Sequence, residues 1–311
     1  MSKKRDFFSI SSLSLDEAKH VLAVAAAWKA APKGAQRGLL PGRAVAIVME
    51  KASTRTRVSF EVGAAQLGAH PVVLGVQGSQ LGRGEPIKDT ARVLSRYCDL
   101  IVYRTFEHQR LVEMASAGAP VINALTDDGH PVQVLCDVLT MLENLASKRG
   151  ELPFERLRGQ RVAWVGDGSS NMARSFVEAA RVFDFHLSMA APEGFRPPAS
   201  EIAEAGRHLS ISGDPREAVK ECTVINTDVW TSMGQEAETK RRLEAFAGYT
   251  VTEALCARAA KDAIVLHCLP AHRGEEIDDA TIEGARSRVW DQAENRLHVQ
   301  KALMAFLLGA A

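Results

Sequence analysis

The chain has 311 residues, more than one typical domain needs, and 46% of them are hydrophobic, enough for substantial cores. Lys plus Arg and Asp plus Glu number 38 each, so net charge does not favour nucleic acid or an anionic membrane, and we expect neither as a partner. The five cysteines include no C-x-x-C pair, which argues against a disulfide framework and against a thiolate zinc site. The sequence shows no signal peptide and no apolar run long enough for a membrane helix, and we therefore expect a cytoplasmic protein.

The first elements of the chain are a helix, a strand and a second helix. Ser14 and Glu17 have the spacing of a capping box, and apolar residues at helical spacing follow them. Residues 44–49 are an apolar, β-branched run that predicts a buried strand. Residues 56–68 predict a helix with Gly68 just past its end. The apolar residues on one face of this helix are Val58, Val62 and Ala65.

The same alternation continues to the middle of the chain. Strands are predicted at 70–76, 99–104 and 120–125, with helices at 85–98 and near 107–117. Because strands and helices alternate in this way, the pattern predicts a parallel sheet.

A long predicted helix at 131–149 separates this series from a second one. The second series has strands at 161–168, 185–192, 222–230 and 262–270, and helices at 171–183 and 294–309. We therefore expect an α/β protein of two doubly wound domains, each with a central parallel sheet, linked by long helices. The expected domains are residues 1–135 and 136–289, with a C-terminal helix at about 290–311 that packs back on the first.

The run Ser-Thr-Arg-Thr-Arg at 53–57 follows the first strand and opens a helix. Unpaired backbone N–H groups and the helix dipole favour an anion there, and guanidinium groups suit phosphate. The alternative is that Ser53 is a simple N-cap followed by two solvated arginines. The run lacks the glycines and the G-K-[ST] ending of a Walker A loop.

Gly166 and Gly168 lie between a predicted strand and a helix, as in a dinucleotide-binding turn. The third position of that fingerprint is Asn171, which is neither glycine nor alanine. Three interpretations stay open: NAD binding, a tight turn, and a turn that presents Asn171 to a small substrate at the carboxyl edge of the sheet.

Two further loops follow strands at the same edge, at 228–234 and 267–274. Cys268 could act as a nucleophile, but its neighbour His267 is a poor base for it, because adjacent strand residues point to opposite faces. Taken alone, Cys268 is typical of a buried strand cysteine. His130 and Gln133 open the long middle helix, either facing a cleft or capping. No set of His, Asp and Glu has the local spacing of a metal site, so no metal is expected.

Taken together, these pieces resemble the aspartate/ornithine carbamoyltransferase family. The motifs that carry the resemblance are STRTR (53–57), YRTFEH (103–108), HPVQVLCD (130–137), DVWTSMGQE (228–236) and HCLPAHRGEE (267–276). Residues 289–304 are also similar to the C-terminal helix of the family. The D-x-x-x-S-M-G and HCLP motifs are similar to the branch that uses ornithine rather than aspartate.

The resemblance implies an active site in a cleft between the two domains, and a homotrimer in which each site borrows a loop from a neighbouring chain. It implies transfer of a carbamoyl group from carbamoyl phosphate to the δ-amino group of L-ornithine, without a cofactor, in arginine metabolism. The first domain would bind carbamoyl phosphate and the second ornithine.

The site residues implied by the resemblance fall into three groups. Those matching the carbamoyl phosphate contacts are Ser53, Thr54, Arg55, Thr56, Gln80, Arg104, His130, Gln133, Cys268, Leu269 and Arg296. Those matching ornithine contacts are Asn171, Asp228, Ser232 and Met233. Those expected to be catalytic are Arg55, Arg104, His130, Asp228 and Cys268. Gln80 matches the loop residue that reaches the adjacent subunit, and Arg57 is expected to be mainly structural.

Two other classes of function remain open from the residues. A nicotinamide-dependent dehydrogenase would explain the glycine turn but leaves the motifs STRTR, HPVQ and SMG without a role. A non-enzymatic protein that binds an anion or an amino acid would also have two α/β domains.

Overall fold

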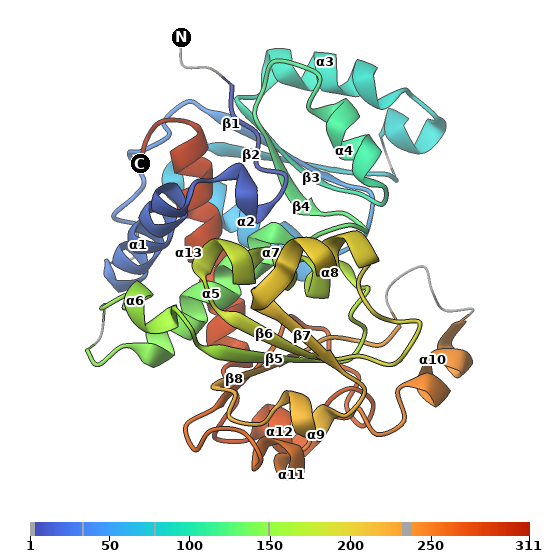
Figure 1. The fold of residues 1–311 in the computed structure, drawn as a ribbon. Helices are drawn as coiled ribbons and strands as arrows, with labels where there is room; N and C mark the ends of the chain where they lie inside the picture. The colour runs from blue at the N-terminus through green and yellow to red at the C-terminus, as the bar shows by residue number, and fades with distance from the viewer. Residues whose placement is uncertain (1–3, 33, 78, 149, 232–237) are drawn as a thin grey trace. The chain divides into compact units, whose positions relative to one another are not determined.

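The protein, as a computed structural model, divides into two compact units (Figure 1). The described residues are 4–32, 34–77, 79–148, 150–231 and 238–311. Unit 1 comprises Met1–Leu139 and Glu294–Ala311, and unit 2 comprises Thr140–Ala293. The unit boundaries fall inside two helices, α5 (Pro131–Leu145) and α13 (Val289–Leu307). The predicted α/β class, with two parallel sheets and linking helices, is confirmed.

Unit 1 is built on a four-stranded parallel sheet in the order β2-β1-β3-β4. Its strands are β1 (Ala44–Met49), β2 (His70–Gly75), β3 (Leu100–Arg104) and β4 (Val121–Leu125). Its other elements are η1 (Ile10–Ser12), α1 (Leu15–Ala30), α2 (Thr54–Leu67), η2 (Gln80–Arg83), α3 (Ile87–Tyr97) and α4 (His108–Met114). Helices α3 and α4 cover one face of the sheet, and α1, α2 and α13 lie on the other (Figure 1).

Unit 2 is built on a five-stranded parallel sheet in the order β7-β6-β5-β8-β9. Its strands are β5 (Arg161–Val165), β6 (His186–Ala190), β7 (Leu209–Ser212), β8 (Val224–Thr227) and β9 (Ile264–His267). Its other elements are α6 (Phe154–Leu157), α7 (Asn171–Phe183), α8 (Ala199–Ala205), η3 (Gly206–His208), α9 (Pro215–Ala218), α10 (Thr239–Ala245), α11 (Glu253–Cys256) and α12 (Asp279–Glu283). Helices α7 and α8 lie on one face of this sheet, and α9, α11 and α12 on the other (Figure 1).

The predicted helix start at Ser14 and helix end at Gly68 are confirmed, whereas the helix predicted at 131–149 ends earlier, at Leu145. The Ser14 side chain accepts a hydrogen bond from the Glu17 N–H, and Glu17 completes the capping box. Gly68 ends α2 in the left-handed conformation, with φ 87°. The apolar face predicted for α2 is not its buried face, however, since Val58 and Val62 are 50% and 39% exposed. The helix instead buries Thr56, Phe60, Gly63, Ala64 and Leu67.

Each sheet has one switch point in its strand order, where the chain begins to add strands on the other side of the first strand. The chain runs from β1 outward to β2 and then places β3 on the other side of β1, and it does the same around β5, with β8 on its second side. In open parallel sheets, ligands bind at the carboxyl ends of the two strands that flank such a switch point. The strand order therefore predicts ligand sites at the carboxyl ends of β1 and β3 in unit 1, and of β5 and β8 in unit 2.

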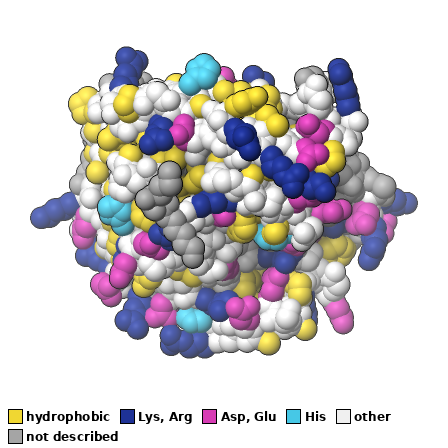
Figure 2. Space-filling model, turned by 90° about the horizontal axis from the view of Figure 1, so that it is seen from above, with side chains coloured by type: hydrophobic (Ala, Val, Ile, Leu, Met, Phe, Trp, Pro, Cys, Tyr) yellow, Lys and Arg dark blue, Asp and Glu magenta, His cyan; other side chains and the backbone are white. Residues whose placement is uncertain are grey.

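The surface carries both signs of charge. On the face shown in Figure 2, Lys and Arg side chains are interspersed with Asp and Glu rather than gathered in one basic area. Among the described residues, no helix has the length and apolar character required to cross a membrane.

Candidate active site

The first group of predicted site residues lies at the end of β1, where α2 begins. Ser53 is the N-cap of α2, and its hydroxyl accepts a hydrogen bond from the Thr56 N–H at 3.2 Å. The Ser53 hydroxyl also donates to Thr56 Oγ1 at 3.1 Å. The predicted cap is thus present, and it leaves other N–H groups of the first turn available to an anion.

The Thr56 hydroxyl accepts hydrogen bonds from two buried guanidinium groups that come from distant parts of the chain. Arg296 on α13 donates to Thr56 Oγ1 at 2.9 Å, and Arg104 at the end of β3 donates to the same atom at 3.5 Å. Arg296 also donates to the Gln133 side-chain oxygen, and Gln133 donates to Asp137 at 2.8 Å. Because Arg104 and Arg296 are 8% and 3% exposed, this corner of unit 1 holds concentrated positive charge that suits an anion.

His130 lies in the same corner, at the start of α5. Burial lowers the pKa of His130 well below 6.5, and the nearby charges of Arg296, Arg104 and Arg55 lower it further. The ring is therefore neutral at physiological pH, so it can polarise a carbonyl oxygen without adding another positive charge.

The remaining predicted residues of unit 1 are more exposed. Arg55 is half-buried and Thr54 is exposed on the first turn of α2. Arg57 points away from the cluster and pairs with Glu61 on the exposed side of the helix, in line with a structural role. Gln80 is exposed at the start of η2, and its expected role toward a neighbouring chain stays a prediction.

In unit 2, the turn after β5 is explained by backbone and packing. Gly166 has φ 134°, which favours glycine. A Cβ on Gly168 would lie 2.5 Å from Met189 Sδ and 3.0 Å from the Phe195 oxygen. Packing against neighbouring side chains thus accounts for the second glycine without a dinucleotide. Asn171 is the first residue of α7, at the carboxyl end of β5.

Asp228 and Cys268 meet at the carboxyl ends of β8 and β9. The Cys268 thiol donates to Asp228 Oδ1 at 3.2 Å, and the Val229 N–H donates to the same oxygen at 2.8 Å. Burial raises the pKa of Asp228, and these hydrogen bonds offset the effect only in part. A buried carboxyl of this kind is suited to receive a cationic amine, which would stabilise its charged form.

His267 is fully buried, and both of its ring nitrogens have partners other than Cys268, although one of them lies within 4.8 Å of the Cys268 sulfur. Its Nε2 lies 2.9 Å from Glu276 Oε1, and its Nδ1 accepts a hydrogen bond from the Leu269 N–H at 2.9 Å. The acceptor role of Nδ1 fixes the proton on Nε2. The histidine thus holds the turn that bears Cys268 and Leu269. Because β9 ends at His267, strand alternation does not describe the relation of the two side chains.

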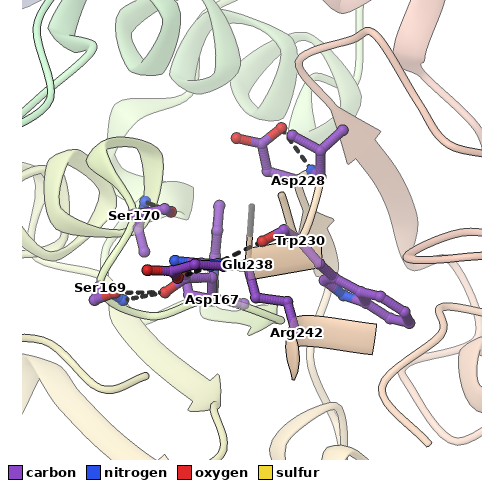
Figure 3. A network of polar contacts seen from close by, with 10 residues as sticks. Asp167, Ser169, Ser170, Asp228, Trp230, Glu238 and Arg242 are labelled. Carbon is purple, nitrogen blue, oxygen red and sulfur yellow. Dashed lines mark hydrogen bonds and ion pairs between the residues drawn. The ribbon is translucent and has the colours of Figure 1, made fainter. Parts of the chain in front are cut away.

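A buried ion pair joins the two loops of unit 2 (Figure 3). Arg242 on α10 donates to Asp167 Oδ2 at 2.6 Å and to the Trp230 oxygen at 2.8 Å, and both charged side chains are at most 7% exposed. Asp167 also accepts from the Ser169 N–H and hydroxyl. The turn before Asn171 and the segment after Asp228 are therefore fixed to each other.

Two groups of potential metal ligands occur among the described residues. Asp228, His267 and Cys268 have ligand atoms within 4.8 Å of one another, as do His272, Glu275 and Glu276. Both ring nitrogens of His267 already have protein partners, so the first group would have to break those contacts to bind a metal. Ser232 and Met233, two of the expected ornithine contacts, lie outside the described residues.

The sequence did not point to two of the polar residues near these sites. Lys51 is buried beside residues 53–57, pairs with Asp127 and lies 4.6 Å from the Phe106 ring centroid. Its position just before the hydroxyl-rich run at 53–57 was the feature of the sequence that could have indicated a place near the site. Arg242 had no such signal, because its partner Asp167 is 75 residues away.

Two family models together match most of the chain. Residues 5–143 match the model described as "Aspartate/ornithine carbamoyltransferase, carbamoyl-P binding domain", and residues 158–307 match that described as "Aspartate/ornithine carbamoyltransferase, Asp/Orn binding domain".

Individual proteins are similar over nearly the full length. The ornithine carbamoyltransferase of Sorangium cellulosum is 62% identical over 308 residues, covering 98% of both chains. The solved ornithine carbamoyltransferase of Pyrococcus furiosus has a TM-score of 0.88 and 42% identity, covering 99% of this chain and 98% of that one. The anabolic ornithine carbamoyltransferase of Campylobacter jejuni has a TM-score of 0.89 and 36% identity, covering 99% and 100%.

Proposed function

The chain belongs to the aspartate/ornithine carbamoyltransferase family, and from this membership we infer that it transfers the carbamoyl group of carbamoyl phosphate to the δ-amino group of L-ornithine, giving L-citrulline and phosphate. The observation that carries the proposal is the cluster at Thr56. Two buried arginines and a neutral histidine, brought from three parts of the chain, meet there at a helix N-terminus.

Carbamoyl phosphate binds at the carboxyl ends of β1 and β3, in the domain of residues 1–135. The first turn of α2 and the arginines hold the phosphate, because its charge matches the helix dipole and the guanidinium groups. The contacts proposed for it in this unit are Ser53, Thr54, Arg55, Thr56, Arg104, His130, Gln133 and Arg296. Gln80 of a neighbouring chain completes the set.

Ornithine binds to the domain of residues 136–289, at the carboxyl ends of β5 and β8. Asp228 accepts the α-ammonium group, and the Cys268 thiol beside it helps to orient the substrate. Asn171, Ser232 and Met233 supply further contacts, while Cys268 and Leu269 also face the carbamoyl group.

The reaction is a direct attack of the δ-amino nitrogen on the carbamoyl carbon. The new C–N bond forms, the C–O bond to phosphate breaks, and the nitrogen loses its extra proton. The amine must first be deprotonated, although its free pKa resembles that of lysine, about 10.4, and a desolvated site lowers that value. Negative charge grows on the carbonyl oxygen and the phosphate, so fixed donors such as Arg55 and His130 are the main catalytic groups.

Formation of citrulline from carbamoyl phosphate and ornithine tests the proposal. Putrescine, aspartate and N-acetylornithine replace ornithine in parallel reactions, and ornithine should be by far the best acceptor. Ligand binding without citrulline would favour a non-enzymatic binding protein. A thermal shift with NAD(P) would favour the dehydrogenase alternative.

Two substitutions test the division of the site. Arg55→Ala should lower kcat by at least about 10²-fold, the scale for loss of one donor to developing negative charge. Arg57→Ala is the matched control and should keep near-normal turnover, because Arg57 pairs with Glu61 on the exposed face. Asp228→Ala should mainly weaken ornithine binding. Loss of carbamoyl phosphate affinity with ornithine affinity intact would contradict the assignment of Asp228.

Assembly, location and metabolic direction complete the proposal. The protein acts as a homotrimer with shared active sites in the cytoplasm, in the direction of arginine biosynthesis. The five free cysteines fit a reducing compartment, and the structural relative from Campylobacter jejuni is named anabolic. Cell fractionation and arginine auxotrophy of a deletion strain test the location and the direction.

A further inference from the structure

Glu50, which directly follows β1, lies at the centre of a hydrogen-bond network that none of the predicted roles explains. Its side chain is 5% exposed. It accepts hydrogen bonds from the Tyr103 hydroxyl at 2.8 Å and from the Thr105 hydroxyl. Arg110 on α4 donates to both of its oxygens, at 3.0 and 2.5 Å.

These contacts lie on both sides of Arg104. Tyr103 and Thr105 are its chain neighbours, and the Glu50 N–H donates to the Arg104 oxygen at 2.8 Å. Along a strand, alternate side chains point to opposite faces. Tyr103 packs in the core that includes residues of α3 and α4, whereas Arg104 reaches Thr56 of α2. Glu50 therefore fixes the backbone of Arg104 from the face opposite to its guanidinium group.

The pairing of β3 with β4 is irregular at the same place. Tyr103 lies opposite Asn123, but Arg104 lies opposite Leu125, so one residue of β4 is skipped. A bulge bends a strand and redirects its side chains, and bulges are frequent next to active sites. Backbone pairing with β1 is regular at Arg104, but the ladder on the β4 side is interrupted there. Side-chain contacts can therefore contribute to the position of Arg104.

The charge of Glu50 is compensated within the network. Burial alone would raise the pKa of Glu50, but the hydrogen bonds from Arg110, Thr105 and Tyr103 outweigh it and lower the pKa. An ionised carboxylate only accepts hydrogen bonds, so it can receive all of these donors at once. The pair is only half-buried, because the Arg110 side chain is 37% exposed, and ion pairs of this kind add little net stability. A role in defining geometry is therefore a better account of it.

We propose that Glu50 is a positioning residue for carbamoyl transfer: it holds the irregular end of β3 so that the Arg104 guanidinium group is placed at the phosphate-binding corner. The proposal rests on the function inferred above, because it takes the Arg104 group to contact the phosphate. A displacement of about 1 Å at such a group can cost a large factor in rate.

The test is a double-mutant cycle read out by the binding of inorganic phosphate, the product, in isothermal titration calorimetry. Glu50→Gln keeps the size of the side chain but places an NH₂ group against the surrounding donors. It should weaken phosphate binding by at least about tenfold, the scale of one hydrogen bond to a charged group, and lower kcat. In the Arg104→Ala background it should have no further effect, because Glu50 acts through Arg104.

Asp99→Asn is the matched control. Asp99 also ties β1 to the neighbouring strand, accepting hydrogen bonds from the Ala44 N–H and from Arg43, but it lies at the opposite, amino end of the sheet. This variant should lose stability while phosphate affinity and kcat stay at the wild-type level. The control separates a general loss of stability from a loss of position.

A second variant protects the test if Glu50→Gln fails to fold. The double substitution Tyr103→Phe and Thr105→Val removes both flanking hydroxyls and leaves Glu50 paired with Arg110. It should weaken phosphate binding in the same way.

The outcomes separate the two levels of inference. If Arg104→Ala leaves phosphate binding unchanged, the assignment of the phosphate site is wrong. If Arg104→Ala weakens binding but neither Glu50→Gln nor the hydroxyl variant does, the positioning role is overturned. Effects that multiply in the double variant would also overturn it, because Glu50 would then act independently of Arg104.

Discussion

At the scale of single residues, His130 shows how its surroundings select a chemical role. Burial, together with the charges of three arginines, keeps its ring neutral, since a further positive charge there would be unfavourable. A neutral imidazole can still donate one hydrogen bond and accept another. The local field thus favours a neutral ring, which fits the role in polarising the carbamoyl oxygen that we propose for it.

The lowered pKa of His130 predicts a pH dependence of stability. In the unfolded chain this ring has a pKa near 6.5. Below that pH the unfolded state binds a proton that the native state excludes, so acidification lowers the free energy of unfolding. From pH 7.5 to 5.5, the wild type should lose more stability than His130→Gln, by on the order of 1 kcal/mol, measured by urea denaturation.

The control is His20→Gln, the same change at an exposed ring. This variant should keep the pH dependence of the wild type. If His130→Gln and the wild type lost equal stability on acidification, the pKa of His130 would not be lowered in the folded protein.

At the scale of elements, the two ends of α2 have different roles: its first turn carries candidate site residues, and its last turn carries the glycine that ends the helix. Its first turn carries the hydroxyls and Arg55, while its last turn ends at Gly68, whose N–H is bonded to Ala64 and Ala65 oxygens. The side of α2 that bears Val58 and Val62 is exposed in the single chain. The two valines are exposed because the buried stripe of α2 includes Phe60, Ala64 and Leu67, which lie on a different side of the helix.

Gly68→Ala should destabilise the protein strongly. The residue has φ 87°, and a Cβ there would lie 2.1 Å from the Arg37 oxygen. The left-handed conformation alone costs about 1–2 kcal/mol for a residue with a Cβ, and the backbone clash adds to it. Urea denaturation of Gly38→Ala provides the comparison, because a Cβ at Gly38 meets nothing within 4 Å. Equal losses from both substitutions would contradict the role assigned to Gly68.

At the scale of the whole molecule, the two parallel sheets have the same arrangement of strands around a switch point. Each sheet places its candidate ligand residues at the carboxyl ends of the strands beside its switch point. Arg104 and the start of α2 occupy that position in unit 1, and Asn171 and Asp228 occupy it in unit 2. The family relationship then adds the expectation that a third contribution, Gln80, comes from a neighbouring chain.

Subunit mixing tests that expectation. Arg55→Ala and Gln80→Ala should each have low activity alone. In a mixed trimer, one site would combine an intact Arg55 with an intact Gln80 from the neighbouring chain, so about one third of the wild-type activity should return. Light scattering should show a particle of three times the chain mass of 33.7 kDa. Mixed samples with no regained activity would place both residues in sites of a single chain.

Local structure and the family could be predicted from the sequence by itself. Periodicity and caps predicted the α/β class, the capping box at Ser14 and the end of α2 at Gly68, because these depend on residues close in the chain. The order of the motifs predicted the family and a set of candidate residues. The strand β7 (Leu209–Ser212) was missed, since it is short, lies at the edge of its sheet and is only partly buried.

The tertiary structure alone decided which side chains touch. Arg296 donates a hydrogen bond to Thr56 from 240 residues away, and Arg242 pairs with Asp167. Glu50 accepts hydrogen bonds from Tyr103 and Thr105, the two chain neighbours of Arg104. Such contacts depend on strand order, on the bulge between β3 and β4 and on the burial of charge, none of which is a local property of the chain. For that reason the donors at residues 53–57 could be recognised in the sequence, whereas the groups that orient their partners could not.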